Sequence, residues 1–173
     1  MRIVAGRWRG RTIKRPADDR VRPTADRVRE AWMSIVQPEL PDARVLDLFA
    51  GSGALGLEAL SRGAAHCDFI EIGARSLAAI RANVDKLGAG DAVTIVRSDA
   101  MKFIEHLERG AYDIAFADPP YGLGLAQSMA ERWIEIPFAT LLGVEHGAKE
   151  RMPGEGDTRR YGDTGITLYR LHR

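Results

Sequence analysis

The chain has 173 residues, of which 45% are hydrophobic and 28% are charged, and its formal net charge is +1. This composition is ordinary for a soluble protein with a sizeable core, and we expect residues 1–173 to form one domain. No stretch approaches the roughly 20 apolar residues of a membrane span, and a single cysteine, Cys67, excludes a disulfide within the chain, so a cytoplasmic protein is expected.

Positive charge is concentrated at the beginning of the chain. Residues 1–29 contain ten Lys and Arg against three Asp, a balance of +7, whereas residues 30–173 carry −6. From Gly6 to Arg22 no apolar periodicity is present, so we expect a stretch that is mobile until it meets an anionic partner. Basic residues around an aromatic ring are typical of RNA contact, because they neutralise phosphates while the ring stacks on a base. A solvated run of charge is the alternative. The residues expected to bind RNA are Arg7, Trp8, Arg9, Arg11, Arg22, Thr24, Arg27 and Arg29.

An amphipathic helix is predicted over residues 24–36. Val28, Trp32 and Val36 belong to an apolar stripe with helical spacing, which indicates a face buried in the core. Thr24 is the expected N-cap of this helix. Two prolines then separate the helix from the first strand of the predicted sheet.

A glycine-rich turn follows that first strand. The strand covers residues 44–50, the turn reads Gly51-Ser52-Gly53-Ala54-Leu55-Gly56, and a helix is predicted over residues 57–63. Glu71 ends the next strand, residues 66–71. Glycines let a ligand approach the backbone, and an acid at the tip of the next strand can hydrogen-bond ribose hydroxyls. The pattern predicts a nucleoside-bearing cofactor.

Asp47 and Asp99 bear on the identity of that cofactor. An acid just before the glycine turn would repel the pyrophosphate of a nicotinamide dinucleotide, but it would attract the ammonium and sulfonium charges of S-adenosylmethionine. We therefore expect S-adenosylmethionine, while a role for Asp47 as a cap of loop amides is the alternative. Asp99 opens a helix predicted to reach Leu107. It can accept a hydrogen bond from the adenine amino group, act as a plain N-cap, or do both.

The sequence Asp118-Pro119-Pro120-Tyr121 follows the apolar strand of residues 112–117. An exocyclic amino group of a nucleobase is a poor nucleophile, so a catalyst must hold it close and accept its hydrogens. The Asp118 carboxylate and the Pro119 carbonyl, whose direction the proline ring fixes, can do this. Tyr121 offers a ring on which a flipped base can stack. A tight turn after a strand is the alternative explanation of this tetrapeptide.

Strands and helices alternate through the rest of the chain. Further strands are predicted at 92–97 and 139–145, further helices at 74–87 and 124–134, a polar loop at 147–158, and a C-terminal antiparallel hairpin at 159–171. This alternation predicts an α/β fold with a doubly wound, Rossmann-like and mostly parallel sheet. Ligands bind outside the carboxyl ends of such strands, so we expect Asp47, Glu71, Asp99 and Asp118 to meet in one crevice.

The chain resembles the bacterial 16S rRNA guanine-N2 methyltransferases of the RsmD family. Five segments carry the resemblance, and they run in the family's order over nearly the whole chain: residues 1–10, 22–30, 47–56, 118–121 and 161–164. The resemblance implies a class I methyltransferase fold and transfer of a methyl group from S-adenosylmethionine to N2 of one guanine in small-subunit rRNA. Within the one expected domain, we predict a basic RNA-binding arm and helix, residues 1–36, and a catalytic core, residues 42–173.

The resemblance also implies the site residues. The cofactor would contact Asp47, Gly51, Gly53, Glu71, Ile72, Asp99 and Ala100, and the guanine would contact Asp118, Pro119, Pro120 and Tyr121. Gly73 departs from the family pattern, in which an Asp is common. The implied partner is 16S rRNA or the small-subunit ribosomal particle. We expect the protein to be a monomer. We expect no metal site, since the four histidines show no metal-like spacing.

Three other functions are set against this one. A nicotinamide-dependent oxidoreductase would use the same glycine turn, but it leaves the basic arm and Asp118-Pro119-Pro120-Tyr121 unexplained. An RNA-binding protein without catalysis would keep the arm and need no acids in the crevice. Adenine-N6 methylation of DNA or RNA is the main alternative, because the same tetrapeptide can also hold the amino group of adenine.

Overall fold

The structure, a computed structural model, describes residues 1–16 and 25–172. The helices are α1 (Ala25–Val36), α2 (Ala54–Ser61), α3 (Ala74–Leu87), α4 (Ala100–Ile104) and α5 (Leu125–Glu135), with 3-10 turns η1 (Gln37–Glu39) and η2 (Gly90–Ala92). The strands are β1 (Arg44–Leu48), β2 (His66–Glu71), β3 (Val93–Arg97), β4 (Tyr112–Ala117), β5 (Ala139–Gly147), β6 (Asp157–Tyr161) and β7 (Thr164–Arg170).

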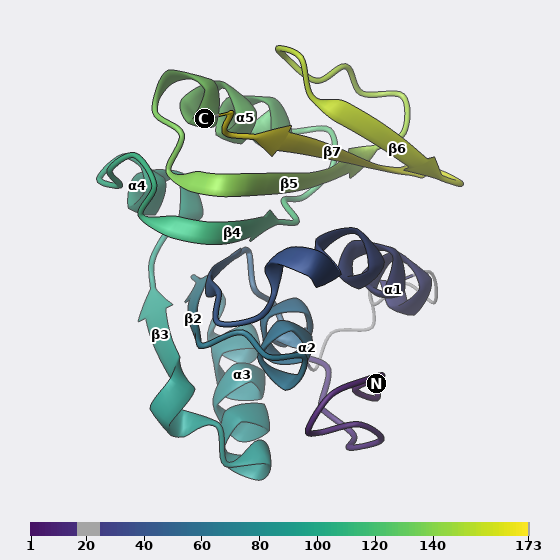
Figure 1. The fold of residues 1–173 in the computed structure, drawn as a ribbon, viewed down its shortest axis with the longest axis vertical. Coiled ribbons are helices and arrows are strands. Elements are labelled where there is room, and N and C mark those ends of the chain that lie inside the picture. The colour runs from purple at the N-terminus through teal and green to yellow at the C-terminus, as the bar shows by residue number, and fades with distance from the viewer. Residues whose placement is uncertain (17–24, 173) are drawn as a thin grey trace.

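These strands form one seven-stranded sheet in the order β3-β2-β1-β4-β5-β7-β6 (Figure 1). Strands β1 to β5 pair in parallel, whereas β7 is antiparallel to both β5 and β6. The predicted doubly wound, mostly parallel sheet with a C-terminal antiparallel hairpin is confirmed. The carboxyl ends of β1, β2, β4 and β5 consequently lie along one edge, where the topology predicts ligand binding.

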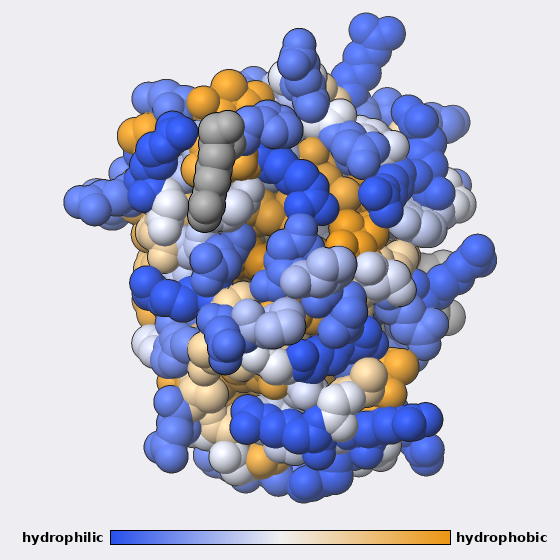
Figure 2. Space-filling model, in the orientation of Figure 1, coloured by the Kyte–Doolittle hydropathy of each residue, from blue (hydrophilic) through white to orange (hydrophobic). Residues whose placement is uncertain are grey.

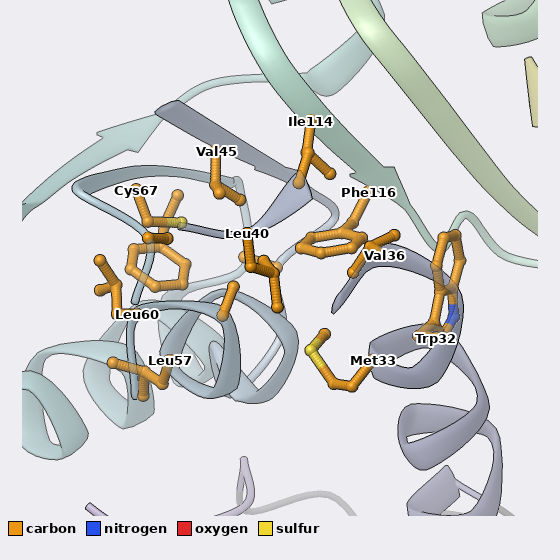
Figure 3. Packing of buried hydrophobic residues seen from close by; sticks show 14 of the residues in the cluster. Trp32, Met33, Val36, Leu40, Val45, Leu57, Leu60, Cys67, Ile114 and Phe116 are labelled. Atoms are coloured by element: carbon orange, nitrogen blue, oxygen red, sulfur yellow. The ribbon is translucent and has the colours of Figure 1, made fainter. Parts of the chain in front are cut away.

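Two hydrophobic clusters cover the two faces of the sheet. Neighbouring residues of one strand alternate between them, so Val45 belongs to the cluster under α1, α2 and α3, and Leu46 to the cluster under α4 and α5. Figure 3 shows the first cluster, in which the Trp32 ring meets the Phe116 ring edge to face with centroids 5.4 Å apart. A side chain at Gly143 would place its Cβ 2.0 Å from the Trp32 ring, so the indole lies directly on the β5 backbone.

The N-terminal segment is anchored by a buried acid of α2. Glu58 is fully buried, and its carboxylate accepts hydrogen bonds from the backbone N–H groups of Val4 (2.8 Å) and Ala5 (3.2 Å) and forms an ion pair with Arg62 (3.1 Å). Gly6, at φ +84°, lies so close to α2 that an added Cβ would come within 1.8 Å of the Ser61 carbonyl oxygen. Only glycine combines this conformation with this approach.

Two further buried polar residues hold the same segment. Ser61 Oγ accepts from the Trp8 N–H (3.0 Å). The Asn83 side chain accepts from the Lys14 N–H (2.7 Å) and donates to the Lys14 carbonyl (2.9 Å). The expectation of a mobile stretch is therefore wrong for residues 6–16, because side chains of α2 and α3 satisfy their backbone. Residues 17–22 of that stretch lie outside the described residues.

Polar side chains cover most of the face seen in Figure 2, with apolar patches between them. The described helices are all too short or too polar to span a lipid bilayer.

Candidate active site

A cleft of about 630 Å³ lies at the carboxyl ends of the parallel strands. Four acids line it, each from a different strand or the residue after one: Asp47, Glu71, Asp118 and Glu145. The prediction that Asp47, Glu71, Asp99 and Asp118 meet in one crevice is confirmed for Asp47, Glu71 and Asp118, whereas Asp99 is not among the lining residues. Its other lining residues include Met1, Arg15, Pro16, Arg29, Trp32, Gly51, Ile72, Pro119, Pro120, Tyr121 and Thr164.

Glu71 joins the glycine turn to the end of β2. Its Oε1 accepts from the Gly51 N–H, and its Oε2 accepts from the N–H groups of Ile72 and Gly73, all at 2.8 Å. Gly51 at φ +59° and Gly53 at φ +81° occupy the left-handed region, which favours glycine. The carboxylate thus fixes two loops that border the cleft. Each oxygen keeps lone pairs with which it can accept hydrogen bonds from ligand hydroxyls.

Asp47 is a nearly buried acid beside the same turn. Only 2% of the residue is exposed, and its Oδ2 accepts from the Gly56 N–H at 3.0 Å. Burial raises the pKa of Asp47 to about 8, the Glu71 charge adds to the rise, and the Gly56 N–H opposes it. An acid held in this way is stabilised in its charged form by a cationic ligand.

Three expected cofactor residues lie outside the cleft lining. Gly53 is the N-cap of α2, and Ala100 is the buried first residue of α4. Asp99 is the N-cap of α4 and accepts from the Lys102 N–H at 3.0 Å. Since β3 is the strand beyond β2, Asp99 lies one strand further out than Glu71. The cap is thus present, and contact of Asp99 with the cofactor stays a prediction.

The tetrapeptide and β5 meet on the other side of the cleft. Asp118 follows β4 directly and is exposed, whereas Pro119 is buried. The Tyr121 hydroxyl donates to Glu145 Oε2 at 2.9 Å and lies 3.0 Å from Thr164 Oγ1. The pKa of Tyr121 is raised, chiefly by burial and further by the charges of Glu145 and Asp118, while the Thr164 hydrogen bond opposes the rise.

Glu145 is also held from α1. Its Oε1 accepts from the Trp32 indole N–H at 3.4 Å, so the carboxylate bridges α1 and Tyr121. Glu145, Trp32 and Thr164 also line the cleft and were not predicted from the sequence. Glu145 carries the same signal as Glu71, an acid near the carboxyl end of an apolar parallel strand, and it could have been found on that ground.

The residues expected to bind RNA fall into three groups: exposed, buried, and outside the described part of the chain. Arg9, Arg11 and Arg27 are exposed, and so is Arg7, whose guanidinium lies 4.1 Å from the centre of the Trp8 ring. Arg22 and Thr24 lie outside the described residues.

Trp8 and Arg29 differ from the expectation. Trp8 is only 8% exposed and joins the core cluster, because its backbone is tied to α2. Arg29 is 5% exposed and donates to the Arg2 carbonyl at 2.6 Å, so it does not project to solvent but lines the cleft. Its Nε has no hydrogen-bond partner within the described part of the chain.

Comparison with known proteins gives a consistent result. A family model described as conserved hypothetical protein 95 matches residues 1–170. Ribosomal RNA small subunit methyltransferase D of Escherichia coli K12 is 44% identical over 128 residues, which cover 73% of this chain and 63% of that relative. The protein of the same name from Haemophilus influenzae is 29% identical over 180 residues, covering 100% of this chain and 93% of that one.

A solved structure shares the whole architecture. The structure of a hypothetical protein from Thermus thermophilus is similar with a TM-score of 0.83 and 30% identity, and the match covers 99% of both chains. Looser likenesses extend to methyltransferases, among them a 16S rRNA methyltransferase of Thermus thermophilus at 19% identity and a TM-score of 0.69, which shows the fold alone. The structure of a putative methyltransferase from Escherichia coli is similar at 36% identity with a TM-score of 0.83, so the sheet is of the class I methyltransferase type.

Proposed function

The chain belongs to the RsmD family, and from this membership we propose that it transfers a methyl group from S-adenosylmethionine to a base of small-subunit rRNA. The observation that carries the proposal is the single cleft lined by both Asp47 and Asp118, because it joins a site for a cationic nucleoside to a site for an amino group. The matched segment spans less than two thirds of the E. coli relative, and the H. influenzae match spans nearly all of its relative.

The residues on the donor side fit S-adenosylmethionine. Glu71 accepts hydrogen bonds and so would hold the ribose hydroxyls, while Asp47 would compensate the positive charges of the donor. Gly51 brings bare backbone to the cleft, and Ile72 offers an apolar surface that is 58% exposed, suited to a flat purine ring. When bound, S-adenosylmethionine supplies a methyl group whose bond to sulfur breaks as a bond to the base nitrogen forms, leaving S-adenosylhomocysteine with the electron pair.

On the acceptor side, the chain's residues position the base and accept a proton. Asp118 and the Pro119 carbonyl would each accept a hydrogen bond from the amino group, which orients the nitrogen lone pair toward the donor. Tyr121 would stack on the base, with its hydroxyl fixed by Glu145. The nitrogen loses one proton on methylation, and Asp118 guides that proton away.

We propose N2 of a guanine as the methylated atom. Support comes from the five family segments in the sequence and from the relatives named for small-subunit rRNA. Mass spectrometry of rRNA nucleosides from cells lacking the protein tests this directly: N2-methylguanosine is expected to be lost at one site. Loss of N6-methyladenosine with N2-methylguanosine intact would instead establish the adenine alternative.

Replacement of Asp118 tests the catalytic assignment. Asp118→Ala is expected to lower methyl transfer by roughly 100-fold or more, because the amino group loses one of its two acceptors and with it its orientation. Affinity for S-adenosylmethionine, measured by calorimetry, should change little. Asp113→Ala is the matched control, since Asp113 is exposed near the opposite end of β4, where its carboxylate accepts from the Arg44 N–H. Full activity of the purified Asp118 variant would refute the assignment.

A further inference from the structure

Both carboxylate oxygens of Glu145 accept hydrogen bonds from neighbouring side chains in the cleft. One carboxylate oxygen accepts from the Trp32 indole N–H at 3.4 Å, and the other accepts from the Tyr121 hydroxyl at 2.9 Å. These donors come from α1 and from the loop after β4, so the carboxylate is fixed from two sides. An ionised carboxylate has about four lone-pair positions. Two donors leave room for a further N–H from a ligand.

The Glu145 carboxylate lies beside the proposed position of the base. Glu145, Tyr121 and Asp118 all line the one cleft. The Tyr121 hydroxyl is within hydrogen-bonding distance of Glu145, and the charges of both Glu145 and Asp118 act on it. A base stacked on the Tyr121 ring with its amino group at Asp118 therefore has the Glu145 carboxylate near its edge.

Purines differ in whether N1, the atom next to the C2 position, donates or accepts a hydrogen bond. Guanine carries an N1–H donor next to its N2 amino group, whereas N1 of adenine and of 2-aminopurine is an acceptor. A fixed carboxylate accepts from the first and repels the lone pair of the others. The tetrapeptide Asp118-Pro119-Pro120-Tyr121 is compatible with either guanine or adenine. A residue outside the tetrapeptide must therefore distinguish the two bases.

We propose that Glu145 is a specificity-determining residue that accepts the N1–H of the target guanine and rejects purines whose N1 is an acceptor. This inference rests on the proposed function and deepens it, because it names the group that distinguishes guanine from adenine. Trp32 and Tyr121 act as positioning residues, since they orient the carboxylate.

The test uses small-subunit rRNA that carries either guanine or 2-aminopurine at the methylated position, prepared by ligation. Both bases present the reacting amino group at C2, and they differ at N1 and at O6. The ratio of kcat/KM for guanine to that for 2-aminopurine is measured for the natural protein, for Glu145→Gln and for Thr164→Val. Comparing variants removes the O6 contribution, which is the same in each.

The natural protein is expected to prefer guanine by at least roughly tenfold, because a site built to accept a donor leaves an unpaired lone pair with the wrong base. Glu145→Gln should lower this preference by about tenfold or more, since the Trp32 N–H keeps the amide oxygen and the NH₂ group can then donate to N1 of 2-aminopurine. Thr164→Val is the matched control: it removes a hydroxyl partner of Tyr121 and leaves the carboxylate, so the preference should persist.

Two results would overturn the inference. If Glu145→Gln lowers kcat/KM equally for both bases, Glu145 merely holds Tyr121. If the natural protein methylates 2-aminopurine as well as guanine, no N1–H contact exists, and this measurement stands even where the variant fails to fold. If the natural protein methylates neither these RNAs nor the unmodified rRNA, whether free or assembled into the small-subunit particle, the proposed function itself fails and the inference with it.

Discussion

At the scale of single residues, burial determines the protonation of Asp47. With a pKa of about 8, against 3.8 for an unperturbed aspartate, the carboxyl is mostly protonated at neutral pH in the protein without ligand. A cationic donor favours the ionised form, so its binding expels a proton. The raised pKa also means that Asp47 lowers the free energy of unfolding progressively as pH rises from about 4 to about 8, the window in which it ionises in the unfolded chain but not in the folded one.

This coupling predicts that affinity for S-adenosylmethionine increases with pH and levels off near pH 8. Below that pH the apparent association constant should rise by up to about tenfold per pH unit, the limit for release of one proton. Calorimetry in two buffers with different ionisation enthalpies counts the released proton. Asp47→Asn, which has no proton to lose, should bind weakly and without this dependence. The absence of proton release at about pH 6.5 in the natural protein would contradict the prediction.

At the scale of elements, the N-terminal segment and α2 form one packed unit. Glu58 alone satisfies two backbone N–H groups that lie more than fifty positions earlier in the chain, and it neutralises Arg62. Removal of this buried acceptor leaves those N–H donors without hydrogen bonds. The free-energy cost of a buried unsatisfied donor exceeds the net stabilisation that its hydrogen bond provides.

Glu58→Ala is therefore expected to lower the free energy of unfolding by about 3 kcal/mol and Tm by roughly 6–12 °C. Hydrogen exchange should show faster exchange at Val4 and Ala5. Glu135→Ala is the control, because Glu135 is 71% exposed in its side chain and pairs with Arg132 only across one helical turn. That change should stay within about 0.5 kcal/mol. Equal effects of the two substitutions would show that the segment is not anchored by Glu58.

The same elements show what the sequence can predict. Apolar runs that end in acids or glycines, such as those before Asp118 and Glu71, identify the strands and their carboxyl ends, because burial on both faces demands uniform apolar character. The docking of residues 1–16 could not be predicted in this way. It depends on backbone groups meeting Glu58, Ser61 and Asn83 from distant positions, and single polar residues on a helix carry no periodic signal.

At the scale of the whole molecule, the docked N-terminal segment, residues 1–16, reaches the cleft at both of its ends. Met1, Arg15 and Pro16 line the cleft, and exposed basic side chains such as Arg9 and Arg11 precede Arg15 on the same docked segment. We therefore expect RNA that enters the cleft at Arg15 to contact Arg9 and Arg11 as well.

Replacement of Arg9 and Arg11 by Ala should weaken RNA binding and reduce the slope of log K against log salt by about 1.5–2, as two phosphate contacts are lost. The control pair is Lys102 and Arg109, located in and after α4 and so on the other side of the sheet. Their replacement removes the same charge and should leave the slope unchanged. If both pairs reduce the slope equally, only net charge matters and the N-terminal segment is not the RNA contact.

The position of Trp32 has a practical consequence. Among the three tryptophans of the chain, Trp32 lines the cleft, whereas Trp8 and Trp133 are not among its lining residues. Its indole rests on Gly143 and donates to Glu145, so a ligand that enters changes the polarity around this one chromophore. Intrinsic emission, read with Trp8 and Trp133 replaced by phenylalanine, would then report occupancy in real time without any attached dye.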